Sequence, residues 1–175
     1  MTYLPGDKSK SERLSEILRV NHAGEYGAKH IYRGQLSVLL GNSKIEHMAK
    51  QEEEHLEFFE NELLKRHIRP SLLSPLWNIG GFMLGKITAK MSVEAAMLCT
   101  EAVEAAITEH YNNQIEELRE IEPELVDTIQ KFRDDELEHH DEAIRSGSKT
   151  APAYSLLYKL INTTSKIAIK IAEKI

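Results

Sequence analysis

Residues 125–143 have the sequence LVDTIQKFRDDELEHHDEA, in which apolar side chains recur every three or four positions. This spacing is typical of an α-helix that buries one face, and it places Leu125 and Phe132 on one stripe. Glu136 and His139 continue the same stripe. The stretch therefore predicts a helix whose buried face is interrupted by a carboxylate and an imidazole.

Three further stretches have the same pattern, with apolar ends and an interruption near the middle. The interrupting residues are Glu25 in residues 11–40, Glu52 and His55 in residues 43–67, and Glu104 in residues 92–120. The apolar members of these three stripes are Leu14, Leu18, Ala28, Tyr32, Leu36, Leu39, Ile45, Met48, Phe59, Leu63, Val93, Met97, Ile107, Tyr111, Ile115 and Leu118. Four stripes interrupted at similar depth are harder to attribute to chance than one.

Prolines and caps separate these stretches. Gly41 can end the first helix, Ser43 with Glu46 has the spacing of a capping box, and Ser92 can cap the third helix. Pro123 suits the first turn of the fourth helix. With no alternating β-branched runs, we expect an all-α, antiparallel four-helix bundle with an extra amphipathic helix at about 154–174.

The composition restricts the classes of protein to which the chain can belong. It has 175 residues, 41% hydrophobic and 29% charged, as expected of one globular domain, residues 1–175. No run of 18 uncharged apolar residues occurs, which argues against a membrane-spanning helix. The single cysteine, Cys99, excludes a disulfide framework and a cysteine-rich metal site. The net charge of -6 disfavours nucleic-acid binding.

Charge is unevenly spread along the chain. Residues 149–175 contain five lysines and one acidic residue, Glu173, whereas the rest of the chain is acidic. A basic, apolar tail of this kind suggests a segment that seeks a surface. Residues 1–13 lack the apolar run of a secretory signal and contain Asp7 and Glu12, unlike a mitochondrial transit peptide. We therefore expect a bacterial chain or an already processed one.

The interrupting residues predict a metal centre. Four carboxylates inside a bundle would repel one another and lose their hydration, so either their pKa values rise or cations compensate them. Two divalent ions would balance four negative charges, and a ligand set of carboxylates and imidazoles suits iron or manganese. One Glu from each of two helices, with Glu-x-x-His from each of the other two, is the dinuclear arrangement of ferritin-like bundles.

The same spacing indicates a weak internal repeat. Glu-x-x-His follows Glu after 27 residues in the first pair of helices and after 32 residues in the second pair. If each pair of helices forms a similar hairpin, this repeat predicts a dinuclear site between the two hairpins.

Other acidic and histidine residues have more ordinary interpretations. Glu101 flanks the stripe of Glu104 and is a weaker candidate ligand, and Asp135 is a candidate hydrogen-bond partner for a ligand histidine. His110 and His140 adjoin the stripes and could support ligands from outside. We expect a solvated acidic face and surface histidines at the remaining positions, namely Glu53, Glu54, Glu57, Glu60, His22, His30, His47 and His67.

The chain resembles the demethoxyubiquinone hydroxylase family of ubiquinone biosynthesis over essentially its whole length. The matching stretches are LRVNHAGEYGA (18–28), QEEEHL (51–56), PLWN (75–78), AVE (102–104), HYNNQI (110–115), FRDDELEHHD (132–141) and APAY (151–154). The blocks HAGEYG and ELEHHD are specific. Asn21 departs from the family, which more often has Asp there.

This resemblance implies a ferritin-like bundle with two iron ions, O2 as co-substrate, and electrons from NADH or through a reductase. The implied iron ligands are Glu25, Glu52, His55, Glu104, Glu136 and His139, the residues that interrupt the stripes. The implied substrate is a polyprenyl quinone intermediate in a membrane, with ubiquinone-biosynthesis proteins as further partners. We therefore expect a peripheral protein on the cytoplasmic face of the bacterial inner membrane, or on the matrix side of the mitochondrial inner membrane.

Two segments could meet such a membrane, at about 71–90 and 154–175. Residues 70–85 are uncharged and contain Trp77, and residues 156–175 place lysines and isoleucines on different faces of a helix. Both segments could instead cover the bundle core or form a dimer seam, and the family resemblance favours the membrane.

His110 and Tyr111 are candidate catalytic residues, because they lie one to two turns from Glu104. They could line the pocket for the quinone ring or relay protons and electrons. A core tyrosine and a surface histidine explain the same residues.

Two other functions fit parts of this pattern. A ferritin-like ferroxidase or iron-storage protein would use the same scaffold, although the uncharged segment argues against it. A non-catalytic helical interaction module would leave the buried Glu and His residues without a metal. A rubrerythrin-like peroxidase is disfavoured because its cysteine cluster is missing.

Overall fold

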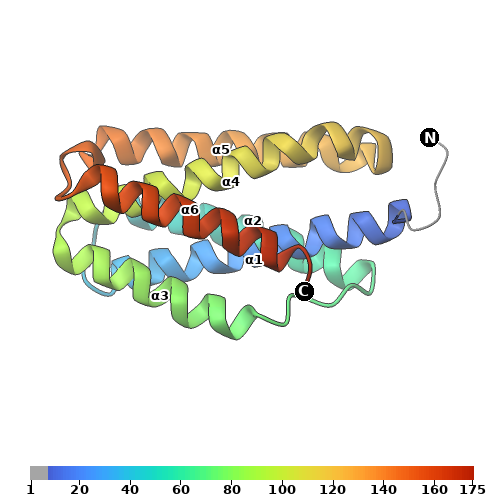
Figure 1. Ribbon diagram of the computed structural model, residues 1–175, viewed down its shortest axis with the longest axis horizontal. Helices are drawn as coiled ribbons and strands as arrows, with labels where there is room; N and C mark the ends of the chain where they lie inside the picture. The colour runs from blue at the N-terminus through green and yellow to red at the C-terminus, as the bar shows by residue number, and fades with distance from the viewer. Residues whose placement is uncertain (1–7) are drawn as a thin grey trace.

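The computed structural model describes residues 8–175, which form helices and turns and contain no strand (Figure 1). The sequence predicts neither a secretory signal nor a mitochondrial transit peptide in residues 1–13. Residues 1–7 of this segment lie outside the described residues. The helices are α1 (Lys10–Leu36), α2 (Ser43–Lys65), α3 (Ser74–Met91), α4 (Val93–Ile121), α5 (Val126–Arg145) and α6 (Tyr154–Ala172), with short 3₁₀ turns at Pro123–Leu125 and Ser148–Thr150. The predicted all-α class is confirmed.

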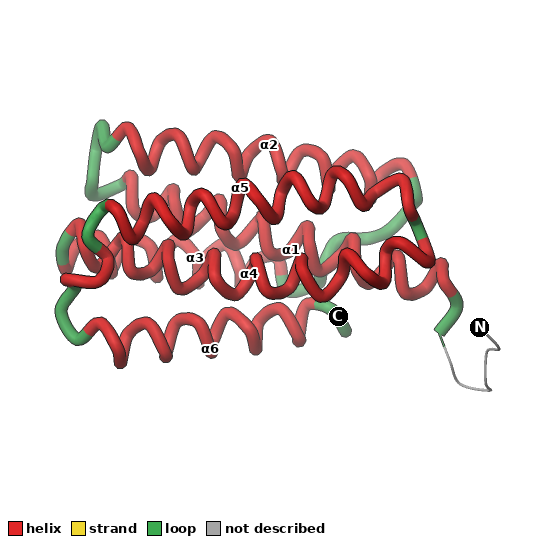
Figure 2. The backbone as a smooth tube through the Cα atoms, turned by 90° about the horizontal axis from the view of Figure 1, so that it is seen from above, coloured by secondary structure: helices red, strands yellow, loops and turns green. Residues whose placement is uncertain are grey.

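The four predicted long helices, α1, α2, α4 and α5, form an antiparallel bundle (Figures 1 and 2). Short turns join α1 to α2 and α4 to α5, so each pair is a hairpin. The predicted bundle is confirmed, and α6 corresponds to the extra helix expected near the C-terminus.

Helix ends depend on local hydrogen bonds. Ser92 caps α4 as predicted, because its hydroxyl accepts a hydrogen bond from the amide of Ala95 at 3.1 Å. The predicted cap at Ser43 is wrong by one residue: the side chain of Asn42 caps α2 by accepting from the amide of Ile45 at 3.3 Å. Helix α1 ends at Leu36, and turns carry the chain on to Gly41, which has a positive φ of 71°.

Helix α3 was not predicted as a helix. The uncharged stretch appeared in the sequence as a connecting segment, yet Ser74–Met91 is helical and packs along α1. Glycines make the approach close: a Cβ at Gly85 would overlap the carbonyl oxygen of Ile31, and one at Gly34 would overlap the carbonyl oxygen of Phe82. Local glycine content weakens a helix, and packing on α1 compensates for that weakness.

The internal repeat extends to a third helix in each half. α3 packs on α1 of its own half, and α6 packs on α4 of the other half. Neither α3 nor α6 packs against α2 or α5 in the described part of the chain. Figure 2 shows α2 and α6 at opposite edges of the molecule. The molecule therefore has one side formed by α2 and α5 and another covered by α3 and α6.

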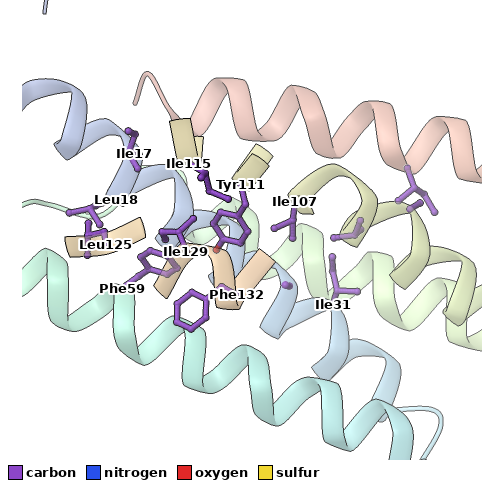
Figure 3. Packing of buried hydrophobic residues seen from close by; sticks show 14 of the residues in the cluster. Ile17, Leu18, Ile31, Phe59, Ile107, Tyr111, Ile115, Leu125, Ile129 and Phe132 are labelled. Carbon is purple, nitrogen blue, oxygen red and sulfur yellow. The ribbon is translucent and has the colours of Figure 1, made fainter. Parts of the chain in front are cut away.

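The predicted stripes form the core. Figure 3 shows Phe59, Tyr111, Ile129 and Phe132 gathered between the helices. The predicted stripe residues depart from burial only at the ends of the stripes, where Val93 is exposed. Leu36 and Leu39 are partly buried there.

Two of the histidine predictions are wrong. His22 and His30 are buried, whereas His47 and His67 are exposed as expected. The buried pair lies on the face of α1 beside Tyr26, where the unpredicted helix α3 covers His30. The predicted acidic face of α2 is exposed at Glu53, Glu54, Glu57 and Glu60.

Within residues 8–175, the helices are all too short or too polar to cross a membrane.

Candidate metal centre

The structure brings all six predicted metal ligands together, in two groups. The first group is Glu25, Glu52, His55 and Glu136, and the second group is Glu52, Glu104, Glu136 and His139. In each group, one oxygen or nitrogen atom per residue lies within 4.8 Å of the others. Glu52 and Glu136 belong to both groups, so the site has the form of two adjacent positions that share two carboxylates.

Each residue comes from the middle of a bundle helix. α1 supplies Glu25, α2 supplies Glu52 and His55, α4 supplies Glu104, and α5 supplies Glu136 and His139. All six side chains are buried, with exposed fractions of 0–2%. Since each lies on the stripe that packs its helix into the core, the same periodicity that buries the apolar residues directs these six inward.

Many candidate ligand atoms of this site have no hydrogen-bond partner among the described residues. These are Glu25 Oε2, both oxygens of Glu52, Glu104 Oε2, Glu136 Oε2 and His139 Nδ1. Buried polar atoms are nearly always partnered, because desolvation without compensation is costly. Unpartnered oxygens and a nitrogen that converge in this way fit two divalent cations, whose charge would offset that of four carboxylates. The six residues therefore suit the implied metal.

The pKa values reflect this crowding. Burial raises the pKa values of Glu52 and Glu104 well above their usual range, and the charge of Glu136 raises them further. Burial also opposes the charge of Glu136, but the adjacent imidazoles of His139 and His55 outweigh it and lower the Glu136 pKa to about 2. His55 loses hydration too, yet its carboxylate neighbours raise its pKa to about 12. Without metal, the site must hold protons to compensate the carboxylates.

The two candidate ligand histidines have the same orientation. Nδ1 of His55 lies 3.1 Å from Glu136 Oε1, and Nδ1 of His139 lies 3.1 Å from Glu52 Oε1. On the outer edge, Nε2 of His55 donates to Asp135 Oδ2 at 3.1 Å, and Nε2 of His139 donates to Gln51 Oε1 at 3.1 Å. Such outer hydrogen bonds leave the inner nitrogen free as a metal ligand.

Asp135 was a candidate partner in the sequence, whereas Gln51 was missed. Each of these residues immediately precedes the Glu of a Glu-x-x-His motif and pairs with the histidine of the other motif. The internal repeat was the signal that could have identified Gln51.

Two tyrosines donate to the carboxylates that the groups do not share. The Tyr32 hydroxyl donates to Glu104 Oε1 at 2.7 Å, and the Tyr111 hydroxyl donates to Glu25 Oε1. The sequence singled out Tyr111 but assigned Tyr32 only to the core. Both are buried, so Tyr111 is a core tyrosine that also contacts a candidate ligand.

His110 lies outside the two groups. Its Nε2 is 3.2 Å from Asn21 Oδ1 and 2.8 Å from Gln114 Nε2. Asn21 therefore still makes a polar contact at the position where it departs from the family. His110 also lines a cavity of about 270 Å³ between α4, α6 and the start of α1. Burial lowers the pKa of His110 to about 4, so this imidazole is neutral at physiological pH.

The remaining candidate residues from the sequence, Glu101 and His140, make their contacts outside the two ligand groups. Glu101 is buried but faces Lys149 at 2.5 Å, Tyr154 at 2.6 Å and Ser148 rather than either group. His140 is only partly buried and pairs with Asp141 at 2.9 Å. A second cavity of about 250 Å³ opens between α2 and α5 and reaches the outer edge of His139.

Known proteins share this sequence over nearly its whole length. The profile of the family described as "Ubiquinone biosynthesis protein COQ7" matches residues 12–172. The chain is 46% identical to the NADPH-dependent 3-demethoxyubiquinone 3-hydroxylase, mitochondrial, of Bos taurus, over 97% of this chain and 81% of the relative. It is 44% identical to the 3-demethoxyubiquinol 3-hydroxylase of Rhodospirillum rubrum, over 98% and 83%. It is also 44% identical to the 5-demethoxyubiquinone hydroxylase, mitochondrial, of Saccharomyces cerevisiae, over 93% and 78%.

Proposed function

Because this chain belongs to the family of the ubiquinone biosynthesis protein COQ7, we propose that it is a 3-demethoxyubiquinol 3-hydroxylase. It would use O2 and reducing equivalents to convert a ring C–H of a quinone intermediate into C–OH. The names of the relatives favour this activity over iron storage and over a non-catalytic interaction module. The observation that carries the proposal is the pair of ligand groups that share Glu52 and Glu136.

We assign two iron ions to these groups. Their oxygen and imidazole donors, with no thiolate, suit iron. Cys99 belongs to neither group, and burial raises the pKa of its thiol to about 12. When bound, the iron pair would supply the O2 chemistry, while the protein supplies ligation, orientation and exclusion of water.

The side chains of the centre perform these three tasks. Glu52 and Glu136 belong to both groups and would help to hold both ions, and Glu25 and Glu104 would each help to hold one of them. Asp135 and Gln51 orient the histidines through their outer nitrogens. The Phe132 ring lies tilted against the His55 ring at a centroid distance of 4.1 Å, which would keep water from that side.

We place the quinone ring near His110. His110 lines the cavity beside α6, and the next residue, Tyr111, donates to Glu25, so one turn of α4 contacts both the cavity and the metal centre. The neutral imidazole of His110 could exchange a proton with a quinol hydroxyl. This would make His110 a substrate-contacting residue and Tyr111 the link to the first group.

The side covered by α3 and α6 would contact the membrane in which a polyprenyl quinone resides. Together these helices contain five lysines and no acidic residue. Large apolar side chains also project from them into solvent, namely Leu76, Ile79, Met83, Ile87 and Met91 on α3 and Leu156, Leu160, Ile167 and Ile171 on α6. Apolar and basic helices of this kind lie in the plane of anionic headgroups.

We propose that this membrane is an inner membrane, with the protein on the cytoplasmic face in a bacterium or on the matrix side in a mitochondrion. The Bos taurus relative is named as mitochondrial and NADPH-dependent. Reduced nicotinamide, directly or through a reductase, would be the electron donor here, and other proteins of ubiquinone biosynthesis would be partners.

The decisive experiment is complementation of a strain blocked at the demethoxyubiquinone step. The intact chain should restore ubiquinone and consume the intermediate, as measured by mass spectrometry of extracted quinones. Glu104→Ala and Glu52→Ala should not, because each removes a proposed ligand. Glu53→Ala is the matched control, since Glu53 is the exposed neighbour of Glu52.

Metal analysis separates the alternatives. Anaerobic loading should give about two iron ions per intact chain and fewer in both ligand variants. Rescue by Glu104→Ala would reject the ligand assignment. Iron binding without consumption of the intermediate would favour iron storage, and the absence of bound iron would favour an interaction module.

A further inference from the structure

Tyr32 and Tyr111 occupy equivalent places in the two halves of the chain. Tyr32 lies seven residues after Glu25 on α1, and Tyr111 lies seven residues after Glu104 on α4. Seven residues are close to two helical turns, so each tyrosine is on the same face as the glutamate of its own helix. Because α1 and α4 are antiparallel, each tyrosine reaches the glutamate of the other helix.

The two tyrosine hydroxyls make the two oxygens of Glu25, and likewise those of Glu104, different from each other. Oε1 of Glu104 accepts from Tyr32, and Oε1 of Glu25 accepts from Tyr111. Oε2 of each of these carboxylates has no hydrogen-bond partner among residues 8–175. By contrast, both oxygens of Glu52, which belongs to both groups, lack a partner in the same region. The tyrosines thus leave one oxygen available on each unshared carboxylate.

The surroundings of Tyr32 keep its hydroxyl in this role. The side chain is 1% exposed, and its ring meets the His139 ring edge-on at a centroid distance of 6.3 Å. The other acceptor near the hydroxyl is Met48 Sδ at 3.8 Å, a weak one.

We propose that Tyr32 is a positioning residue of the metal centre, which holds Glu104 so that only Oε2 can bind the metal of the second group. Tyr111 does the same for Glu25 and the first group. This inference rests on the proposed metal centre. Each of the two metal positions therefore has its own tyrosine. Substitution of one tyrosine should perturb one metal position separately from the other.

The test is stepwise Co²⁺ titration of the full chain, followed by its visible absorption. Tyr32→Phe removes one oxygen and keeps the ring, and it should weaken one of the two Co²⁺ steps by about 10- to 100-fold, as loss of a hydrogen bond to a ligand typically does. Its absorption should also change, because Glu104 becomes free to bind through both oxygens. Tyr111→Phe should weaken one step by a similar factor.

Tyr26→Phe is the matched control. Tyr26 is on the same helix, and its hydroxyl accepts a hydrogen bond from Asn78 on α3 at 3.3 Å rather than donating to a candidate ligand. This variant should bind Co²⁺ as the parent does.

A second comparison separates positioning from general damage to the fold. In a Glu104→Ala background, Tyr32 has no carboxylate to hold, so adding Tyr32→Phe should leave the remaining Co²⁺ affinity unchanged. Further weakening there would overturn the positioning role, as would Tyr32→Phe that titrates like the parent. If the parent chain binds no metal, the proposed function fails and this inference fails with it.

Discussion

Two buried glutamates one turn apart on α4 show how surroundings decide the role of a residue. Both oxygens of Glu101 accept hydrogen bonds from the protein, from Lys149 and Tyr154 on one side and Ser148 on the other. Glu104 accepts only one, from Tyr32, and its Oε2 has no partner within the described chain. Glu101 is therefore satisfied without a metal, whereas Glu104 is not.

Their pKa values move in opposite directions for the same reason. Burial opposes the charge of both residues. For Glu101, hydrogen bonds from Lys149, Ser148 and Tyr154 outweigh burial and lower the pKa. For Glu104, the nearby Glu136 adds to burial and raises the pKa. Sequence position alone could not distinguish the two.

Glu101→Gln should destabilise the protein at neutral pH by about 1–3 kcal/mol, because it removes a buried charge that three donors stabilise. Since the folded-state pKa of Glu101 is lowered, its contribution is complete above the unfolded pKa near 4.5 and disappears as the pH falls through the folded value. Denaturant unfolding of both proteins at pH 7 and at decreasing acidic pH measures this, and the difference between them should shrink below pH 4.5.

The control for this prediction is Glu109→Gln. Glu109 is exposed on the same helix and pairs with Lys166 at 2.5 Å, a surface ion pair expected to contribute at most about 1 kcal/mol. Equal losses in the two variants would contradict the special role of Glu101.

At the scale of elements, the contact between α1 and α3 depends on the absence of side chains. Gly34 on α1 and Gly85 on α3 each face the backbone of the other helix, at Phe82 and Ile31 respectively. This explains why α3 is a helix although its sequence is rich in glycine. It also explains how an uncharged segment covers His30 on one side while exposing large apolar residues on the other.

Gly85→Ala should displace α3 from α1, because the new Cβ would meet the carbonyl oxygen of Ile31, which is part of the α1 backbone. We expect a loss of about 1–3 kcal/mol in the free energy of unfolding, as for other overpacked sites. Thermal or denaturant unfolding measures this loss.

Gly80→Ala provides the opposite expectation on the same helix. A Cβ there meets nothing within 4 Å, so the higher helix propensity of alanine should leave stability unchanged or raise it by up to about 1 kcal/mol. If Gly85→Ala were as stable as Gly80→Ala, the close contact would not exist in solution.

At the scale of the whole molecule, the two sides differ in charge and polarity. The side formed by α2 and α5 exposes Glu46, Glu53, Glu54, Glu57, Glu60, Asp127, Asp134, Glu138 and Asp141. The side covered by α3 and α6 has lysines, no acidic residue within either helix, and a set of exposed apolar residues. An anionic surface would therefore attract the second side and repel the first.

Binding to vesicles that contain anionic phospholipid tests this orientation. A double variant, Ile79→Gln with Leu160→Gln, should lower the vesicle partition coefficient about tenfold or more, since each exposed apolar side chain is expected to contribute more than about 1 kcal/mol when buried in lipid. Co-sedimentation measures the partition coefficient, which should also fall as salt concentration rises.

The matched control changes the same number of exposed large apolar residues on the other side, with Leu64→Gln on α2 and Leu137→Gln on α5. This variant should bind vesicles as the parent does. If both double variants lost binding equally, membrane contact through α3 and α6 would be wrong.

The sequence by itself determined the four long helices and the apolar stripe that each one buries in the core. Helical periodicity is local, so a stripe and its interruptions at Glu25, Glu52, Glu104 and Glu136 can be identified without knowing any neighbour. The structure brings these residues and both histidines together, although their role as ligands stays a prediction.

Only the tertiary structure decided the features that depend on contacts between helices. These include the helical state of α3, the burial of His22 and His30, and the partners of Gln51 and Tyr32. Each results from two segments distant in sequence that meet in a particular register, and no periodicity within either segment encodes that register. Glycine lowers the helix propensity of α3 locally, and its helix forms because α1 accepts its backbone at close range.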